Sequence, residues 1–174
     1  MRNQISINSF AESIAIIEFL RVLLDEMSIS WREAWMNIYR TFSCTIYSFE
    51  YEKYEQWELE LLQKILPRHV ELIYLINHFF LMQVKQDLMK KQIAELVINQ
   101  AMQNMSLISP CKKYVRLANF CFISCHKVVF VSELIKQELL SGVFKDFSIF
   151  LPEKKFQVIE SGVNPRKQLH LCNP

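Results

Sequence analysis

The chain has 174 residues, of which 51% are hydrophobic and 22% charged, and its formal net charge is +2. This composition predicts a single globular domain with a sizeable core. The small net charge argues against nucleic acid as a partner, and no apolar run is long enough to predict a membrane span or a secretory signal. Five cysteines without the spacing of a disulfide framework indicate a reducing, cytoplasmic location.

Glycine is scarce, with only Gly142 and Gly162 present. Loops that cradle phosphate need several glycines, because backbone N–H groups must approach the anion closely. The sequence therefore excludes a Walker loop and a dinucleotide-binding fingerprint.

The first half of the chain predicts one short strand followed by helices. Ser9 and Ser30 can each cap a helix, and the fixed φ of Pro67 allows a new helix to begin there. Residues 47–56, aromatic and charged without a clear period, are interpreted as a loop. In chain order, we expect a strand at 5–8 and helices at 9–26, 31–42, 58–66 and from Pro67 past Lys90.

The second half is less regular. Residues 85–104 have weak periodicity and are either a helix extension or a mobile insertion, and residues 115–124 fit a helix or a strand. The β-branched run at 127–131 predicts a buried strand. Ser132 can cap a helix that ends at Gly142, and residues 155–159 predict a last strand. The expected fold class is α/β, mostly helical with three short strands, in one domain spanning residues 1–174.

Several segments occur in the order and spacing of one family. They are "SWREAW" (30–35), "LPRHVELIYLIN" (66–77), "GVFKDF" (142–147), "KFQ" (155–157) and "GVNPRKQLHLCNP" (162–174). Together they resemble the glycogen phosphorylases, the α-1,4-glucan phosphorylases, from about Gln4 to Pro174. Relative to this family, residues 86–104 are an insertion or mobile segment.

The resemblance implies that the chain is part of the N-terminal domain of a GT-B type fold. Family members are several times longer, so we expect Pro174 to be where a fragment stops. The family reaction is phosphorolysis of glycogen, and its pyridoxal phosphate is bound by a lysine in the later half. No cofactor is therefore expected in this chain.

Most sugar-contacting motifs of the family are altered here. NDTHP is replaced by "NSFAE" (8–12), TNHT by "TIYS" (45–48), SHAVNGV by "CHKVVFV" (125–131), and the Asn before GVTPRRW by a serine. The positions that the resemblance assigns to the glucosyl site are Tyr47, Val131 and Ser161. No intact set of catalytic residues remains among them. A site that recognises sugar hydroxyls needs its polar groups in place, so we expect this chain to be inactive in phosphorolysis.

A second, non-catalytic glucan site of the family is better preserved. The resemblance assigns Arg68, Tyr74, Asn77 and Lys113 to it, and Tyr74 and Asn77 are three residues apart on one helix face. Without the resemblance, these would be interpreted as ordinary surface residues. The expected partners are glycogen or another α-1,4-glucan, or a full-length phosphorylase subunit. The alternatives are a non-catalytic module that binds one of these, and a degenerate gene product without function.

A cysteine–histidine group invites a metal interpretation. Cys121, Cys125 and His126 lack a fourth ligand, and two cysteines four apart on an apolar segment are more often buried thiols. No metal site is therefore predicted.

Overall fold

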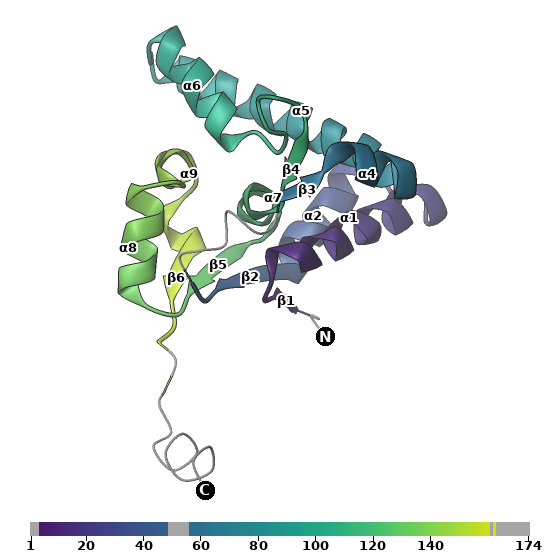
Figure 1. The fold of residues 1–174 in the computed structure, drawn as a ribbon, viewed down its shortest axis with the longest axis horizontal. Coiled ribbons are helices and arrows are strands. Elements are labelled where there is room, and N and C mark those ends of the chain that lie inside the picture. Colours follow the sequence, from purple (N-terminus) through teal and green to yellow (C-terminus); the bar gives the residue numbers. More distant parts are fainter. Residues whose placement is uncertain (1–3, 49–55, 161, 163–174) are drawn as a thin grey trace, which may run out of the picture.

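The computed structural model describes residues 4–48, 56–160 and 162. At its centre lies an all-parallel sheet in the order β1-β2-β5-β6 (Figure 1). These strands are Ile5–Ile7, Phe42–Ile46, Lys127–Phe130 and Phe156–Val158. Parallel strands require crossover connections, which the helices provide. The α/β, mostly helical fold class is thereby confirmed.

The helices surround this sheet and extend well beyond it. They are α1 (Ile14–Arg21), α2 (Trp31–Thr41), α4 (Leu59–Ile65), α5 (Pro67–Lys90), α6 (Glu95–Met105), α7 (Leu117–Ser124), α8 (Glu133–Ser141) and α9 (Lys145–Phe150). Single turns of 3-10 or π geometry are η1 (Phe10–Ser13), η2 (Val22–Glu26) and η3 (Glu153–Lys155), and a small antiparallel pair joins β3 (Gln56–Glu58) to β4 (Tyr114–Arg116). Figure 1 shows α5 and α6 as an arm that projects away from the sheet.

The helix starts predicted from capping residues are confirmed. The Ser30 hydroxyl accepts a hydrogen bond from the Glu33 amide at 3.4 Å, and α2 follows. Ser132 does the same for Ile135 at 3.2 Å, and Pro67 is the first residue of α5. These are local signals, because one polar side chain or one fixed φ satisfies or removes an unpaired backbone N–H.

Several elements were absent from the sequence-based prediction. Strand β2 follows α2 without any turn residue between them, and it is specified by its pairing with β1 and β5 on either side. Helix α9 and the β3–β4 pair were not expected either. The ambiguous segment at 115–124 divides, with Val115 in β4 and Leu117 beginning α7. All eight residues of α7 are buried, so no polar face reveals the helical period.

Residues 86–104 form parts of two helices joined by a turn. Helix α5 continues to Lys90, and α6 buries Ile98, Ala101 and Met105 on one face. Leu88 is buried near the end of α5. Apolar Leu96 and Val97 of α6 are 84% and 54% exposed, and such residues on the solvent side weaken the helical period of this segment. That it is an insertion relative to the family stays a prediction, as does the single partial domain.

Stacked phenylalanines form the centre of the core. Phe122 of α7 lies 4.2 Å from Phe144 and 5.3 Å from Phe147, measured between ring centroids. Phe147 in turn stacks on Phe80 of α5 at 6.3 Å, and Phe156 of β6 lies 6.0 Å from Phe122. Large rings of this kind bury much apolar area each. One aromatic cluster thus joins α5, α7, α9 and the sheet.

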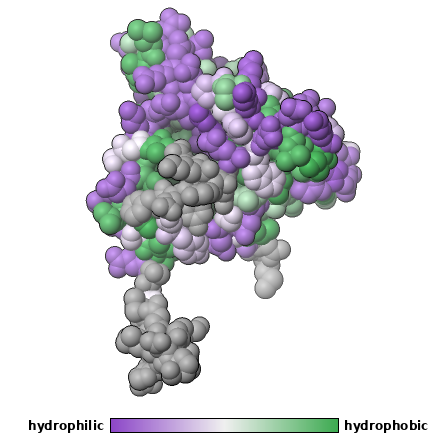
Figure 2. Space-filling view, in the orientation of Figure 1, coloured by the Kyte–Doolittle hydropathy of each residue, from purple (hydrophilic) through white to green (hydrophobic). Residues whose placement is uncertain are grey.

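The surface is mostly hydrophilic on the face shown in Figure 2, with an apolar patch in the region of α4. Leu61 and Ile65 of α4 are 54% and 64% exposed. No helix in the described ranges is long and apolar enough to cross a membrane.

Candidate functional site

An open pocket of about 510 Å³ lies between α5, α6 and the segment that follows α6. It is lined by Tyr74, Asn77, Leu81, Asn99, Met102, Gln103, Ser106, Ile108, Ser109, Pro110 and Lys112. The pocket therefore contains two of the four residues that the sequence assigned to a glucan site. Its polar side chains stand beside apolar ones, which is the usual character of a small-molecule pocket.

Asn77 holds one wall of this pocket in place. Its side-chain oxygen accepts hydrogen bonds from the Leu107 amide at 2.8 Å and from the Ser106 hydroxyl at 3.2 Å. Leu107 is fully buried, so its N–H needs such a partner. Among the described residues, the Asn77 amide nitrogen has no partner and can donate to a ligand. Tyr74, one turn earlier on α5, is 45% exposed.

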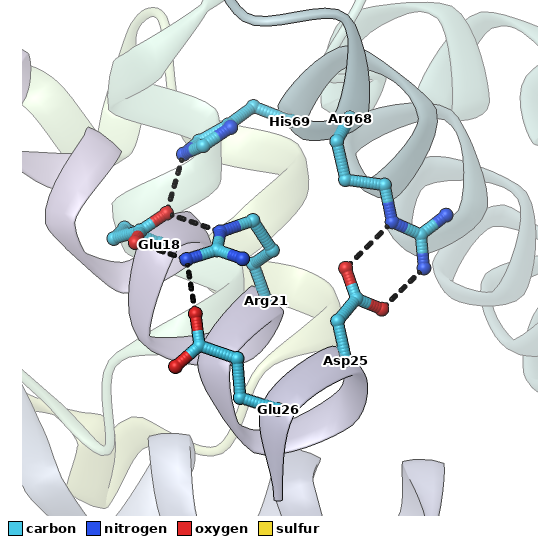
Figure 3. Close-up of polar contacts among 6 residues, drawn as sticks. All are labelled: Glu18, Arg21, Asp25, Glu26, Arg68 and His69. Atoms are coloured by element: carbon cyan, nitrogen blue, oxygen red, sulfur yellow. Dashed lines mark hydrogen bonds and ion pairs between the residues drawn. The ribbon is translucent and has the colours of Figure 1, made fainter. Parts of the chain in front are cut away.

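Arg68 lies outside the pocket, at the start of α5. Figure 3 shows its guanidinium in a two-point contact with Asp25, at 2.9 and 2.7 Å, and it also contacts Glu71 at 2.8 Å. The hydrogen bond from Arg68 lowers the pKa of the Asp25 carboxyl. Arg68 thus joins α5 to η2, and its assignment to glucan binding stays a prediction.

A second group of charged side chains beside Arg68 joins the start of α5 to α1 and η2 (Figure 3). Arg21 contacts Glu18 and Glu26 at 2.8 and 2.7 Å, and His69 lies 3.0 Å from Glu18. The hydrogen bond from Arg21 lowers the pKa of Glu18. These contacts fix the start of α5 against α1 and η2, and so set the direction of the helix that carries Tyr74.

Lys113 is also absent from the pocket lining, whereas its neighbour Lys112 is part of it. The Lys113 amide donates to the Ser109 hydroxyl at 3.2 Å, and its carbonyl accepts from Leu59 at 2.8 Å. Lys112 has a positive φ of 56°, which belongs to the tight turn after Pro110. The turn therefore directs Lys112 to the pocket, and glucan binding by Lys113 stays a prediction.

Sequence reasoning missed the contribution of α6. Asn99 and Gln103 are four residues apart, with Met102 beside them, and all three line the pocket. The i, i+4 spacing of the two amides was the available signal. It was overlooked because residues 85–104 gave no clear helical period.

Two of the three predicted glucosyl-site positions, Tyr47 and Val131, lie at another place, the carboxyl edge of the parallel sheet. Tyr47 directly follows β2, and its hydroxyl donates to the Asn8 side chain, beyond β1, at 3.4 Å. Val131 follows β5, and its amide donates to the Ile46 carbonyl at 3.3 Å. Ser161 lies outside the described residues. Ligands of open α/β sheets commonly bind at this edge, and the assignment of these positions to a glucosyl site stays a prediction.

In the cysteine–histidine group the two cysteines are buried and the histidine is half-buried. Cys121 and Cys125 are fully buried, and burial raises the pKa of the Cys121 thiol. The Nδ1 atom of His126 lies 2.7 Å from the carbonyl oxygen of Phe42. Among the described residues, no group of three or more His, Cys, Asp or Glu side chains is placed to hold a metal ion.

Comparisons with known proteins establish the family. The family model for carbohydrate phosphorylase matches residues 1–174, and the chain belongs to that family. It is 35% identical to the glycogen phosphorylase of Saccharomyces cerevisiae over 98% of the chain, and 35% identical to the liver form of Bos taurus over 98%. The glycogen phosphorylase of Chlamydia trachomatis is 34% identical over 97%. The resemblance inferred from sequence motifs is thereby confirmed.

These relatives are far longer than the chain. It spans 18% of the yeast protein, 19% of the bovine protein and 20% of the chlamydial protein. The matched region is therefore about a fifth of a glycogen phosphorylase.

Proposed function

We propose that the chain serves the phosphorolysis of α-1,4-glucan to glucose 1-phosphate, in glycogen breakdown, by binding glucan and without catalysing the reaction itself. The family supports the substrate. The altered residues at the carboxyl edge of the sheet support the lack of catalysis, because Ile46 and Tyr47 replace an Asn and a His of the family pattern. Val129 and Phe130 likewise replace an Asn and a Gly. Such an edge offers few of the polar groups that a sugar ring requires.

The observation that carries this proposal is the pocket between α5 and α6. Tyr74 offers an exposed ring against which the apolar face of a glucose unit can lie, and Asn77 offers a free amide group beside it. Asn99, Gln103 and Lys112 line the same pocket and supply further hydrogen-bond donors. An aromatic ring for stacking, together with several amide side chains for hydrogen bonds, suits the binding of a sugar.

The test is co-sedimentation of the purified chain with glycogen, alongside a phosphorolysis assay with inorganic phosphate and added pyridoxal phosphate. We expect the wild type to sediment with glycogen and Tyr74→Ala to remain in the supernatant. Tyr114→Ala is the matched control, since Tyr114 is 40% exposed but lies on β4, outside the pocket. Arg68→Ala and Lys113→Ala decide whether these two residues also contribute.

Three outcomes would contradict the proposal. Release of glucose 1-phosphate would show that the chain is catalytic. Equal sedimentation of wild type and Tyr74→Ala would show that glucan binds elsewhere, and a folded wild type that stays in the supernatant would remove glucan binding altogether.

A second candidate function is docking on a full-length phosphorylase subunit. Within the described residues β1 pairs only with β2, and Ile5 is 46% exposed at this edge. Parallel sheets usually have their edges and faces covered, so an exposed edge strand favours a protein partner. Size-exclusion chromatography with a full-length phosphorylase tests it, and separate elution would exclude it.

Two broader assignments belong to the same proposal. The parallel sheet with its crossover helices supports placing the chain in the N-terminal half of a GT-B fold. A relative from Arabidopsis thaliana, 30% identical, is named as a cytosolic alpha-glucan phosphorylase, which supports a cytoplasmic location.

A further inference from the structure

A second pocket, of about 280 Å³, lies on the other side of α5 and has no role in the proposed function. It is lined by Trp31, Trp35, Tyr39, Ile76, Phe79, Phe80, Gln83, Ile123, Phe150, Leu151 and Lys155. Six of these eleven residues are aromatic, and Lys155 is the one charged side chain among them. The pocket is therefore mostly aromatic and contains a single cationic side chain.

Lys155 is buried without a counter-ion among the residues that the structure describes. Its side chain belongs to a residue only 2% exposed, and its ammonium donates to the Ile123 carbonyl at 3.3 Å. The same group lies 5.3 Å from the centroid of the Tyr39 ring. An ammonium carries three protons, and the described residues offer it this one acceptor. Burial lowers the pKa of Lys155 to about 8, because the charged form loses its water.

The aromatic wall is built by helical spacing. Trp31, Trp35 and Tyr39 are four residues apart along α2, so their rings lie on one face. The indole rings of Trp31 and Trp35 are stacked, with centroids 6.1 Å apart and planes 7° apart. Phe79 of α5 extends this surface 5.5 Å from Trp31 and is 45% exposed, which leaves the wall open to a ligand from solvent.

We propose that this pocket binds a small aromatic carboxylate, with its ring against the Trp and Tyr side chains and its carboxylate on the Lys155 ammonium. The carboxylate supplies the missing acceptors and the opposite charge, and a charge-assisted hydrogen bond in a dry site is a strong one. A neutral aromatic molecule would fill the pocket but leave the cation unpaired. The volume limits the ligand to one or two rings. This inference depends on the second pocket alone and not on glucan binding.

Isothermal titration calorimetry of the full chain tests the proposal with 2-naphthoate and its neutral isostere 2-naphthamide. We expect naphthoate to bind the wild type more tightly than naphthamide. In Lys155→Met, naphthoate affinity should fall roughly 10- to 100-fold, the value of a hydrogen bond to a charged group, while naphthamide affinity is retained. Lys154→Met is the matched control, since Lys154 is an exposed neighbour outside the pocket and its loss should change neither affinity.

A pH series on the wild type gives a readout that needs no variant. Among the described residues, the titratable groups near the Lys155 ammonium are Tyr39, whose ring it faces, and the Cys125 thiol. Since the carboxylate needs the protonated amine, naphthoate affinity should fall roughly tenfold per pH unit above about pH 8. The proposal is overturned if the wild type binds no naphthoate, if Lys155→Met binds it equally well, or if the affinity is unchanged between pH 7 and pH 10.

Discussion

The two pockets lie on nearly opposite faces of one helix, α5. At 3.6 residues per turn, Tyr74, Asn77 and Leu81 share one face, whereas Ile76, Phe79, Phe80 and Gln83 share the other. The first pocket is larger and rich in amides, and the segment after α6 forms one of its walls. The second is smaller, aromatic and built on the core. A single amphipathic helix thus presents two chemically different surfaces.

The two pockets also differ in what maintains their shape. The wall of the first depends on hydrogen bonds from Asn77 to the segment at 106–107. The wall of the second includes Phe80, which belongs to the phenylalanine cluster through Phe147 and Phe150. Loss of Phe80 in the second pocket therefore reaches the core, whereas loss of Asn77 in the first pocket affects one wall.

The largest effect is expected from Phe80→Ala. Removing this buried ring should lower the free energy of unfolding by about 3 to 5 kcal/mol, because a cavity remains in the cluster. Phe79→Ala, one residue earlier but 45% exposed, should cost about 1 kcal/mol or less. Urea denaturation monitored by circular dichroism measures both. Similar costs for the two variants would contradict the view that only one of these rings supports the core.

The next largest effect is the pH dependence that Lys155 introduces. Its pKa is lowered from 10.5 to about 8 in the folded chain, so folding disfavours the charged form. This penalty is fully present below about pH 8 and disappears as the pH rises toward about 10.5. Between pH 7 and pH 10, the wild type should gain roughly 2 to 3 kcal/mol of stability relative to Lys155→Met. Denaturation of both proteins across this range measures it, and a constant difference would mean that Lys155 is not desolvated.

A smaller effect is expected from Asn77→Ala in the first pocket. The buried Leu107 N–H loses its acceptor, which should lower the free energy of unfolding by about 1 to 2 kcal/mol and weaken glycogen co-sedimentation. Asn99→Ala is the control, because Asn99 is exposed and lines the same pocket without a described hydrogen bond. It should weaken glycogen binding with a stability change of about 0.5 kcal/mol or less. Equal stability of both variants would show that Asn77 does not support the pocket wall.

Part of the candidate site could be predicted from the sequence. Tyr74 and Asn77 were assigned through the resemblance, and their three-residue spacing placed them on one face of a predicted helix. Arg68 and Lys113 came from the same resemblance, but their contacts depend on neighbours distant in sequence, Asp25 and Leu59. No sequence pattern showed these contacts.

Features that depend on a few adjacent residues could be predicted from the amino-acid sequence alone. The helix starts at Ser30, Pro67 and Ser132 follow from local capping and backbone geometry, and the β-branched run at 127–131 specified β5. The motif order also identified the phosphorylase family. Contacts with distant parts of the chain do not oppose these local preferences, so the preferences can be predicted from the sequence.

The remaining features depend on contacts between distant parts of the chain. Strand β2 exists because β1 and β5 supply its hydrogen bonds on both sides, and α6 becomes part of a pocket because it packs on α5. Lys155 begins the run predicted as the last strand, and its packing beside residues of α2 and α5 removes it from water. The physical reason is the same in each case: burial and strand pairing bring together residues that are far apart in the chain.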